Sequence, residues 1–179
     1  MTDAGGAATV SSADLAAVGA QLGRTPRGTH AVGHRCPCSL PDVVVTEPRL
    51  PDGTPFPTTY YLTCPRATSL IGTLEGSGLM RAMETRLGED AALAAAYRRA
   101  HEAYLAARAA LGDVSEIAGI SAGGMPDRVK CLHVLAAHSL AAGPGVNPLG
   151  DEVLERLDAW WSDGPCVDLP QDPGRDPDG

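Results

Sequence analysis

The sequence predicts an α+β fold that is mostly helical, with a short N-terminal antiparallel β-ribbon and helices packed around a long central helix. Aromatic residues make up only 4% of the chain and alanine is abundant, a composition that favours a helix-rich core. Two stretches rich in β-branched and aromatic residues flank a turn sequence in the first third of the chain. From residue 66 onward, apolar residues instead recur at helical spacing.

The N-terminal segment carries one short predicted helix. Residues 1–11 are small and polar, and we expect them to be disordered. Ser12 can cap a helix over residues 13–22, and Gly23 can end it. The basic stretch RTPRGTHAVG, residues 24–33, follows and has the character of a linker.

Two strands are predicted next, at VVVTEPRL (43–50) and TTYYLTC (58–64). Between them, the Asp-Gly pair at 52–53 is typical of a hairpin turn. A hairpin centred on this pair places Thr63 opposite Asp42. Prolines in and between the strands lack an N–H donor, so we expect the ribbon to be short, bulged or at a sheet edge.

A series of helices is predicted after the ribbon. Short helices are expected over residues 66–78 and 79–88, and the clearest helix of the chain over 89–112. The apolar positions of this long helix recur at helical spacing: Leu93, Ala96, Tyr97, Ala100, Tyr104, Ala107 and Leu111. The long helix is therefore the expected centre of the helical part.

Two further helices complete the predicted domain. A glycine-rich loop precedes a helix over 126–142, which has a proline in its first turn. The last helix, over 149–161, has Asn147 as its cap. The sequence thus predicts a single globular domain over 12–161, followed by a disordered tail rich in Asp, Pro and Gly over 162–179.

Charge and hydropathy exclude some classes of protein. The net charge of −8 argues against general nucleic-acid binding, which needs a basic surface. The N-terminus does not resemble a signal peptide, and no stretch has the length of a membrane-spanning helix, so we expect a cytoplasmic protein without membrane insertion. Five cysteines, an odd number, fit thiols or metal ligands better than a disulfide framework.

Four cysteines are predicted to bind one metal ion. The hairpin places Cys64 close to the start of the first strand, and the chain from there back to Cys38 and Cys36 is short, so these three thiols should share one neighbourhood. Zn²⁺ takes four such ligands, and Cys131, on the helix over 126–142, can supply the fourth. Zinc is the expected metal and iron the alternative.

The sequence leaves alternatives to this ligand set. His34, His133 or His138 could replace one cysteine. We expect only one ligand from the helix that carries Cys131. Cys131 and His133 would point to different faces of it, whereas Cys131 and His138 would lie two turns, about 10 Å, apart. The cysteines could also be free thiols, or include a redox or nucleophilic cysteine.

The stretch GGMPDRVK predicts an anion site. It places Gly123 and Gly124 before a predicted helix N-terminus, and Arg128 and Lys130 within its first turns. Exposed N–H groups and the positive end of the helix dipole favour an anion there, which a guanidinium can bind in a fork. We therefore expect a small anionic ligand, phosphorylated or carboxylated. The alternative is a glycine turn with solvated charges, in which Asp127 pairs with Lys130.

Two histidines, His101 and His133, are the candidates for catalysis. On the long helix, one stripe combines four polar side chains: Tyr97, His101, Tyr104 and Arg108. The stripe could form a pocket wall in which His101 moves a proton. The alternative is an amphipathic seam with His101 at its border. Spacing alone supports no triad of nucleophile, base and acid.

Several motifs carry a family resemblance. RCPC, PRLPDGTPFPTTYYLTCPR, YRRAHEAYLAAR and GGMPDRVKCLHVLAAHSLAAGPGVNPLGDEVL resemble, in this order, the bacterial domain-of-unknown-function 501 family, which is common in actinobacteria. The family motifs include Cys36, Cys38, Cys64, Arg128, Lys130, Cys131 and His133. Family sequences often have glycine after the second cysteine, where Ser39 stands here, in a turn that needs positive φ.

The resemblance implies no particular reaction. Genes of the family often lie near those for enolase, a septum-formation-initiator-like protein and an exopolyphosphatase, which implies a cytoplasmic housekeeping role. Two hypotheses follow. The first is a zinc-binding protein or enzyme that takes a small anionic ligand. The second is a non-catalytic protein that binds a protein partner, with a structural metal or free thiols, linked to cell division or envelope growth.

Overall fold

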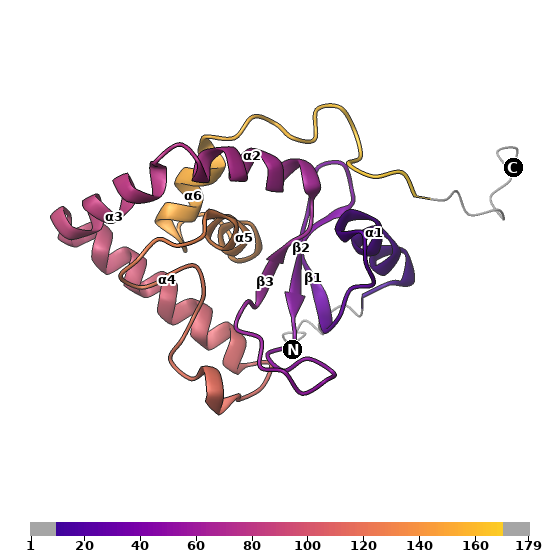
Figure 1. Cartoon of the computed structure of the whole chain (residues 1–179), viewed down its shortest axis with the longest axis horizontal. Coiled ribbons are helices and arrows are strands. Elements are labelled where there is room, and N and C mark those ends of the chain that lie inside the picture. Colours follow the sequence, from indigo (N-terminus) through magenta and orange to yellow (C-terminus); the bar gives the residue numbers. More distant parts are fainter. Residues whose placement is uncertain (1–9, 170–179) are drawn as a thin grey trace, which may run out of the picture.

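The computed structural model of the chain describes residues 10–169. Disorder was predicted for residues 1–11 and 162–179. Of these, residues 1–9 and 170–179 lie outside the described residues. The elements follow one another as α1 (Ser12–Leu22), β1 (Thr29–Arg35), β2 (Pro41–Thr46), β3 (Tyr60–Leu62), α2 (Pro65–Glu75), α3 (Leu79–Glu89), α4 (Ala91–Ala109), the 3-10 turn η1 (Ser115–Ile117), α5 (Leu132–Ala142) and α6 (Pro148–Glu155). The predicted α+β class is confirmed (Figure 1).

The sheet is antiparallel with the strand order β1-β2-β3. The predicted hairpin is confirmed in its register, since Val44 pairs with Tyr61 and the Thr63 N–H donates to the Asp42 carbonyl at 2.8 Å. The prediction of a linker over 24–33 is wrong for its second half, which forms β1. This strand contains glycine and histidine instead of a β-branched run, and its pairing with β2 maintains its extended conformation.

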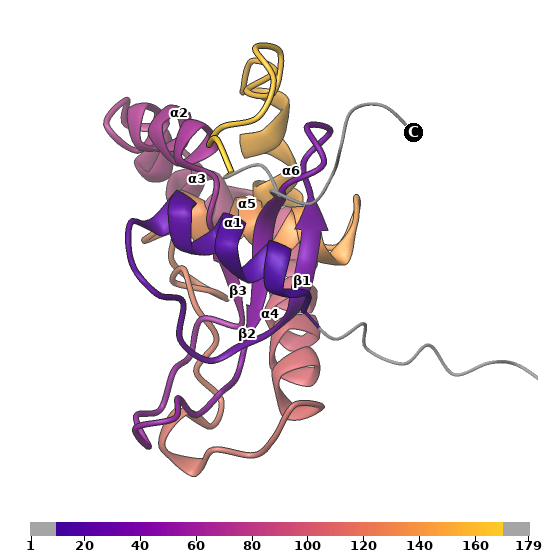
Figure 2. The ribbon, with the colours of Figure 1, turned by 90° about the vertical axis from the view of Figure 1, so that its right-hand side faces the viewer.

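The two faces of the sheet are covered by different helices. Helix α1 lies on one face and α5 on the other (Figures 1 and 2). Helix α1 begins one residue earlier than predicted, because Ser11 and not Ser12 is its cap: the Ser11 side chain accepts the Asp14 N–H at 3.1 Å. Gly23 ends the helix in the left-handed conformation, as predicted.

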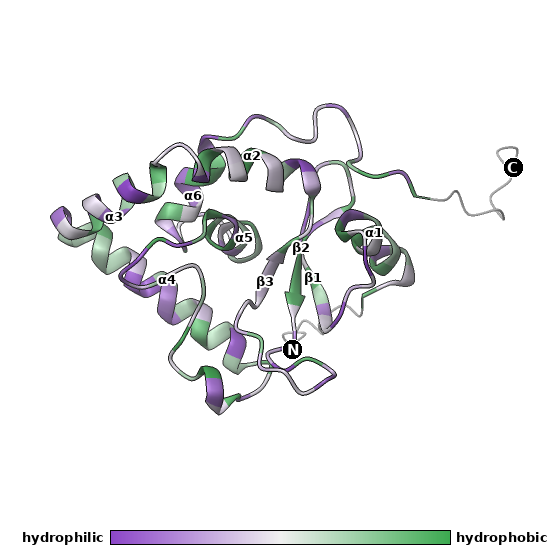
Figure 3. Ribbon diagram, viewed as in Figure 1, coloured by the Kyte–Doolittle hydropathy of each residue, from purple (hydrophilic) through white to green (hydrophobic). Residues whose placement is uncertain are grey.

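The core is centred on α5 more than on the longer α4. Most of α5 is buried, and Figure 3 shows it as a largely hydrophobic helix, whereas α4 buries one face. Helices α5 and α6 cross closely at Gly150, where a Cβ would lie 2.1 Å from the Leu135 carbonyl oxygen. Glycine is therefore required at this crossing.

His138 is one of the polar side chains of this core. It is 1% exposed and stacks on Tyr60, with the ring centroids 5.5 Å apart. The Asn147 amide lies 3.2 Å from its Nδ1, and burial lowers the pKa of His138 to about 4. Asn147 also caps α6, as predicted, by accepting the Gly150 N–H at 3.0 Å. These contacts make His138 a neutral core residue.

The chain beyond α6 continues along the surface. Helix α6 ends at Glu155, earlier than the predicted end at residue 161. Residues 162–169, which the sequence assigned to the tail, run back over α2 (Figure 1), where the Arg66 guanidinium donates to the Gly164 carbonyl at 2.9 Å. Among residues 10–169, no helix has both the length and the apolar character needed to cross a membrane.

Candidate metal centre

Three potential metal ligands meet where α2 ends and α5 begins. Glu75 is the last residue of α2, Cys131 directly precedes α5, and His133 lies in its first turn. One carboxylate oxygen, the thiol sulfur and one imidazole nitrogen all lie within 4.8 Å of one another. Within the described residues, this is the one set of three or more such side chains that could hold an ion.

The position of Cys131 depends on where α5 starts. The predicted helix start at Pro126 is wrong, because residues 123–130 form a turn whose N–H groups bond to the glycine carbonyls. The Arg128 N–H donates to the Gly124 carbonyl and the Lys130 N–H to the Gly123 carbonyl, both at 2.8 Å. Helix α5 therefore begins at Leu132. The expectation that Cys131 and His133 point to different helix faces does not apply, since Cys131 lies outside the helix.

Glu75 replaces a side-chain cap at this helix start. Cys131 occupies the cap position of α5 without a side-chain hydrogen bond to it. The Glu75 carboxylate instead accepts the Leu132 N–H at 2.7 Å, where an acid is favoured by the positive end of the helix dipole. No sequence pattern marked Glu75, because its partner His133 lies 58 residues later.

Both ring nitrogens of His133 face acceptors. Nδ1 lies 3.0 Å from the Glu75 carboxylate and 3.9 Å from the Cys131 sulfur, and Nε2 lies 3.0 Å from the Thr68 carbonyl oxygen. Contact with Cys131, the Thr68 carbonyl and Glu75 raises the pKa of His133 to about 9, against the opposing effect of burial. Without a metal, His133 is thus a charged imidazolium that links α2 to α5.

A cavity of about 410 Å³ lies beside the cluster. Cys131 and His133 form part of its wall, and β3 and α2 supply most of the rest, including Tyr60, Tyr61 and Thr68. The cavity is large enough for a small molecule. A ligand in it would lie next to the thiol and the imidazole.

The other predicted cysteine ligands form pairs elsewhere. The Cys38 N–H lies 3.4 Å from the Cys36 sulfur, and burial raises the pKa of Cys36 to about 12. Burial also raises the pKa of Cys64 to about 11, and its neighbouring thiol is Cys166. Of the four predicted cysteine ligands, Cys131 alone belongs to a group of three or more potential ligand atoms within 4.8 Å of one another among residues 10–169.

Of the alternative histidine ligands, only His133 joins a cysteine. His34 is next to the buried Asp42, with Nδ1 2.7 Å from its carboxylate, and His138 belongs to the core. The other catalytic candidate, His101, is half-buried on α4, 2.8 Å from the Ser121 hydroxyl. Burial, assisted by the Arg98 charge, lowers the pKa of His101.

The polar stripe of α4 is a buried seam. Tyr97 and Tyr104 are fully buried, and their hydroxyls bond to the Arg128 carbonyl at 3.0 Å and to the Thr59 N–H at 2.7 Å. The buried Arg108 guanidinium donates to two backbone carbonyls, those of Pro57 and Ile117. The stripe thus anchors loops to α4, in agreement with the amphipathic alternative.

The predicted anion site has a different character in the structure. Gly123 and Gly124 adopt positive φ angles in a tight turn, and no helix starts there. The Arg128 guanidinium donates to the Glu84 carboxylate at 3.1 Å and is 65% exposed. Asp127 pairs with Arg98 and not with Lys130. The loop therefore lacks the helix dipole and the unpaired guanidinium on which that prediction depended.

The fold and the ligand set define a small α+β protein with a candidate transition-metal site between two helices. The chain belongs to the family described as "Protein of unknown function (DUF501)", whose sequence profile matches residues 32–155. This range contains Glu75, Cys131 and His133. Comparison with curated proteins and with solved structures gives no match.

Proposed function

We propose that the protein binds a zinc ion through Glu75, Cys131 and His133, with one coordination position open to a small molecule in the neighbouring cavity. The observation that carries the proposal is that the Glu75 carboxylate at the end of α2 lies within 4.8 Å of the Cys131 thiol and the His133 imidazole at the start of α5. Sulfur, nitrogen and oxygen donors of these kinds are the ones that zinc takes in proteins.

The distances between the ligand atoms suit such an ion. Two ligands on a tetrahedral zinc lie about 3.5 Å apart, given bond lengths of about 2.0–2.3 Å. The sulfur of Cys131 lies 3.9 Å from Nδ1 of His133, and Nδ1 lies 3.0 Å from the Glu75 oxygen. Small side-chain rotations would therefore complete the coordination.

The environment of His133 supports a metal at Nδ1. A metal-bound histidine usually donates its other ring N–H to a carboxylate or a backbone carbonyl, which fixes the orientation of the ring. Nε2 of His133 has such a partner in the Thr68 carbonyl, at 3.0 Å. Zinc would displace the proton from Nδ1 and replace the imidazolium that holds Glu75.

Three protein ligands are typical of a zinc site that acts on a bound molecule, whereas structural sites have four. Such an ion can polarise a carbonyl or phosphoryl group, or activate a water molecule at neutral pH. Since Cys131 and His133 line the cavity, the fourth position would face its interior. We therefore propose a metal-assisted reaction of a small molecule.

The test is the metal content of protein purified without a metal-affinity column. We expect about one zinc per chain in the wild type and almost none in Cys131→Ser and His133→Ala. Cys36→Ser and Cys64→Ser are the matched controls, because these thiols lie outside the cluster, and both should retain zinc.

Two results would contradict the proposal. Loss of zinc from Cys36→Ser and Cys64→Ser, with zinc retained in His133→Ala, would favour the four-cysteine ligand set. Wild-type protein that is free of zinc and iron, takes up neither on reconstitution and has freely titratable thiols would exclude a metal. The non-catalytic hypothesis would then be preferred.

A further inference from the structure

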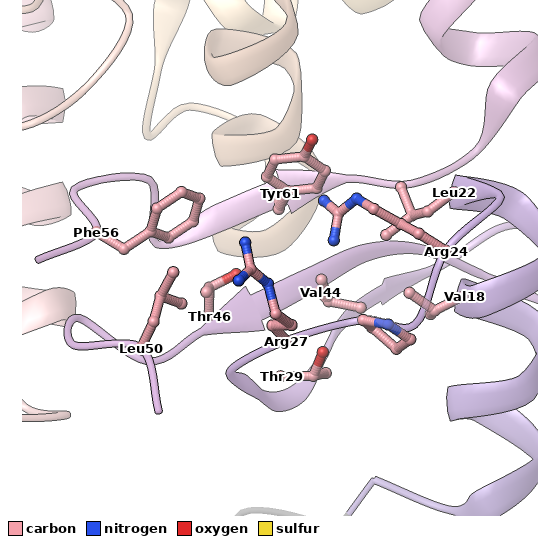
Figure 4. Close-up of a pocket in the computed structure, with 11 residues that line it drawn as sticks. Val18, Leu22, Arg24, Arg27, Thr29, Val44, Thr46, Leu50, Phe56 and Tyr61 are labelled. Atoms are coloured by element: carbon pink, nitrogen blue, oxygen red, sulfur yellow. The ribbon is translucent and has the colours of Figure 1, made fainter. Parts of the chain in front are cut away.

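A second cavity lies on the opposite face of the sheet from α5, beneath the segment that joins α1 to β1 (Figure 4). Its floor is apolar: Val18 comes from α1, Val44 from β2, and Leu50 and Phe56 from the connection between β2 and β3. Val18 and Val44 are almost completely buried. The apolar floor is therefore part of the packed structure.

The segment above this cavity, residues 24–28, has a defined backbone. Gly23, directly before the segment, and Gly28, its last residue, both adopt positive φ angles. A Cβ at Gly28 would lie 2.7 Å from the Leu50 side chain. The Gly28 carbonyl accepts the Glu47 N–H at 2.7 Å, which fastens the segment to the end of β2. The opening between segment and sheet is thus fixed by backbone contacts.

Two guanidinium groups converge at the mouth of the cavity. Figure 4 shows the side chains of Arg24 and Arg27 directed to the same space in front of Tyr61. Arg27 lies 3.6 Å from Asp52, and both side chains are more than half exposed, so this ion pair is weak. Within residues 10–169, no carboxylate lies within ion-pair distance of Arg24.

Two like charges at one opening repel each other, and a bound anion would relieve this repulsion. Glu47, directly after β2, is engaged by His30, with Nδ1 2.6 Å from its carboxylate. The hydroxyls of Thr29 and Thr46 also line the cavity and can donate to an anion.

We propose that this cavity binds a small organic anion, with its carboxylate or phosphate between Arg24 and Arg27 and a short aliphatic group on the apolar floor. The cavity measures about 70 Å³ on a measure by which one water molecule needs about 10–15 Å³, so only a few carbon atoms fit. The site shares no ligand residue with the proposed metal centre, and the two proposals can fail separately.

The test is a titration of the full-length chain, labelled with ¹⁵N, and followed by two-dimensional NMR. The probes are 3-methylbutanoate, 3-methylbutyl phosphate, inorganic phosphate and 3-methylbutanol. We expect one or both organic anions to bind and to shift the amides of Thr29, Val44 and Thr46, which line this cavity and not the one beside the metal centre. Inorganic phosphate and the alcohol should bind at least about tenfold more weakly, because phosphate lacks the aliphatic group and the alcohol lacks the negative charge. The tighter organic anion identifies the head group.

Variants separate the site from general charge effects. Arg24→Ala and Arg27→Ala should each weaken binding at least about tenfold, since each removes a charge-assisted hydrogen bond. Arg99→Ala, at an exposed position of α4, is the control and should bind as the wild type does. All three positions are exposed, so the variants should fold, which circular dichroism can verify.

Three results would overturn the proposal. One is the absence of binding of both organic anions up to about 10 mM. Another is equal binding of inorganic phosphate and the organic anions, which would mean that the apolar floor takes no part. The third is unchanged binding in both Arg24→Ala and Arg27→Ala, or amide shifts confined to other parts of the chain.

Discussion

Substituting Gly150 by alanine tests the close approach of α6 to α5 at the centre of the core. The added Cβ would lie 2.1 Å from the Leu135 carbonyl oxygen and 2.4 Å from the Ser139 hydroxyl. The hydroxyl can rotate away, whereas the carbonyl belongs to the backbone of α5 and can move only with the helix. Overpacking of this kind costs about 1–3 kcal/mol, and the backbone contact places Gly150→Ala near the upper end. For a chain of this size, about 3 kcal/mol lowers the Tm by about 6–12 °C.

Thermal and urea denaturation followed by circular dichroism would measure this effect. Gly72→Ala is the matched control, because Gly72 lies within α2 and a Cβ there meets nothing within 4 Å. Alanine at an open helical position stabilises by about 0.5–1 kcal/mol. The two substitutions should therefore change stability in opposite directions. If Gly150→Ala were as stable as Gly72→Ala, the close approach of α6 to α5 would be refuted.

Three further predictions concern single side chains. Burial lowers the pKa of His138 from 6.5 to about 4, so the unfolded chain binds more protons between these values. Up to roughly 3 kcal/mol of stability, fully present above pH 6.5, should be lost as the pH falls to 4, and urea midpoints for His138→Gln should lack this dependence. Ser39 has φ 76°, so Ser39→Gly should stabilise by up to about 1 kcal/mol in urea denaturation, whereas Ser39→Ala should give no gain. Glu75→Gln retains an acceptor for the Leu132 N–H but loses the negative charge. Competition with a chelator should show that its zinc affinity is reduced by about 10–100-fold. An unchanged zinc affinity would remove Glu75 from the ligand set.

Features that depend on neighbouring residues could be predicted from the sequence. The Asp-Gly pair at 52–53 marked the turn between β2 and β3 and predicted the register of the two strands. The helical spacing of apolar residues located α4 and its buried face. Asn147 was recognisable as a cap because it bonds to a backbone N–H only three residues later. Ser39 likewise has the positive φ expected of the turn at this position.

Tertiary structure decided the features whose partners are remote in sequence. Strand β1 has a weak strand signal of its own and exists through its pairing with β2. Glu75, 57 residues earlier, supplies the acceptor for the first N–H of helix α5. The same carboxylate contacts His133 and lies close to Cys131. The sequence by itself thus determined the family, the fold class and the individual residues Cys131 and His133. Only the packing of α2 against α5 decided that they meet a carboxylate, because a ligand set depends on distances between segments that local patterns do not encode.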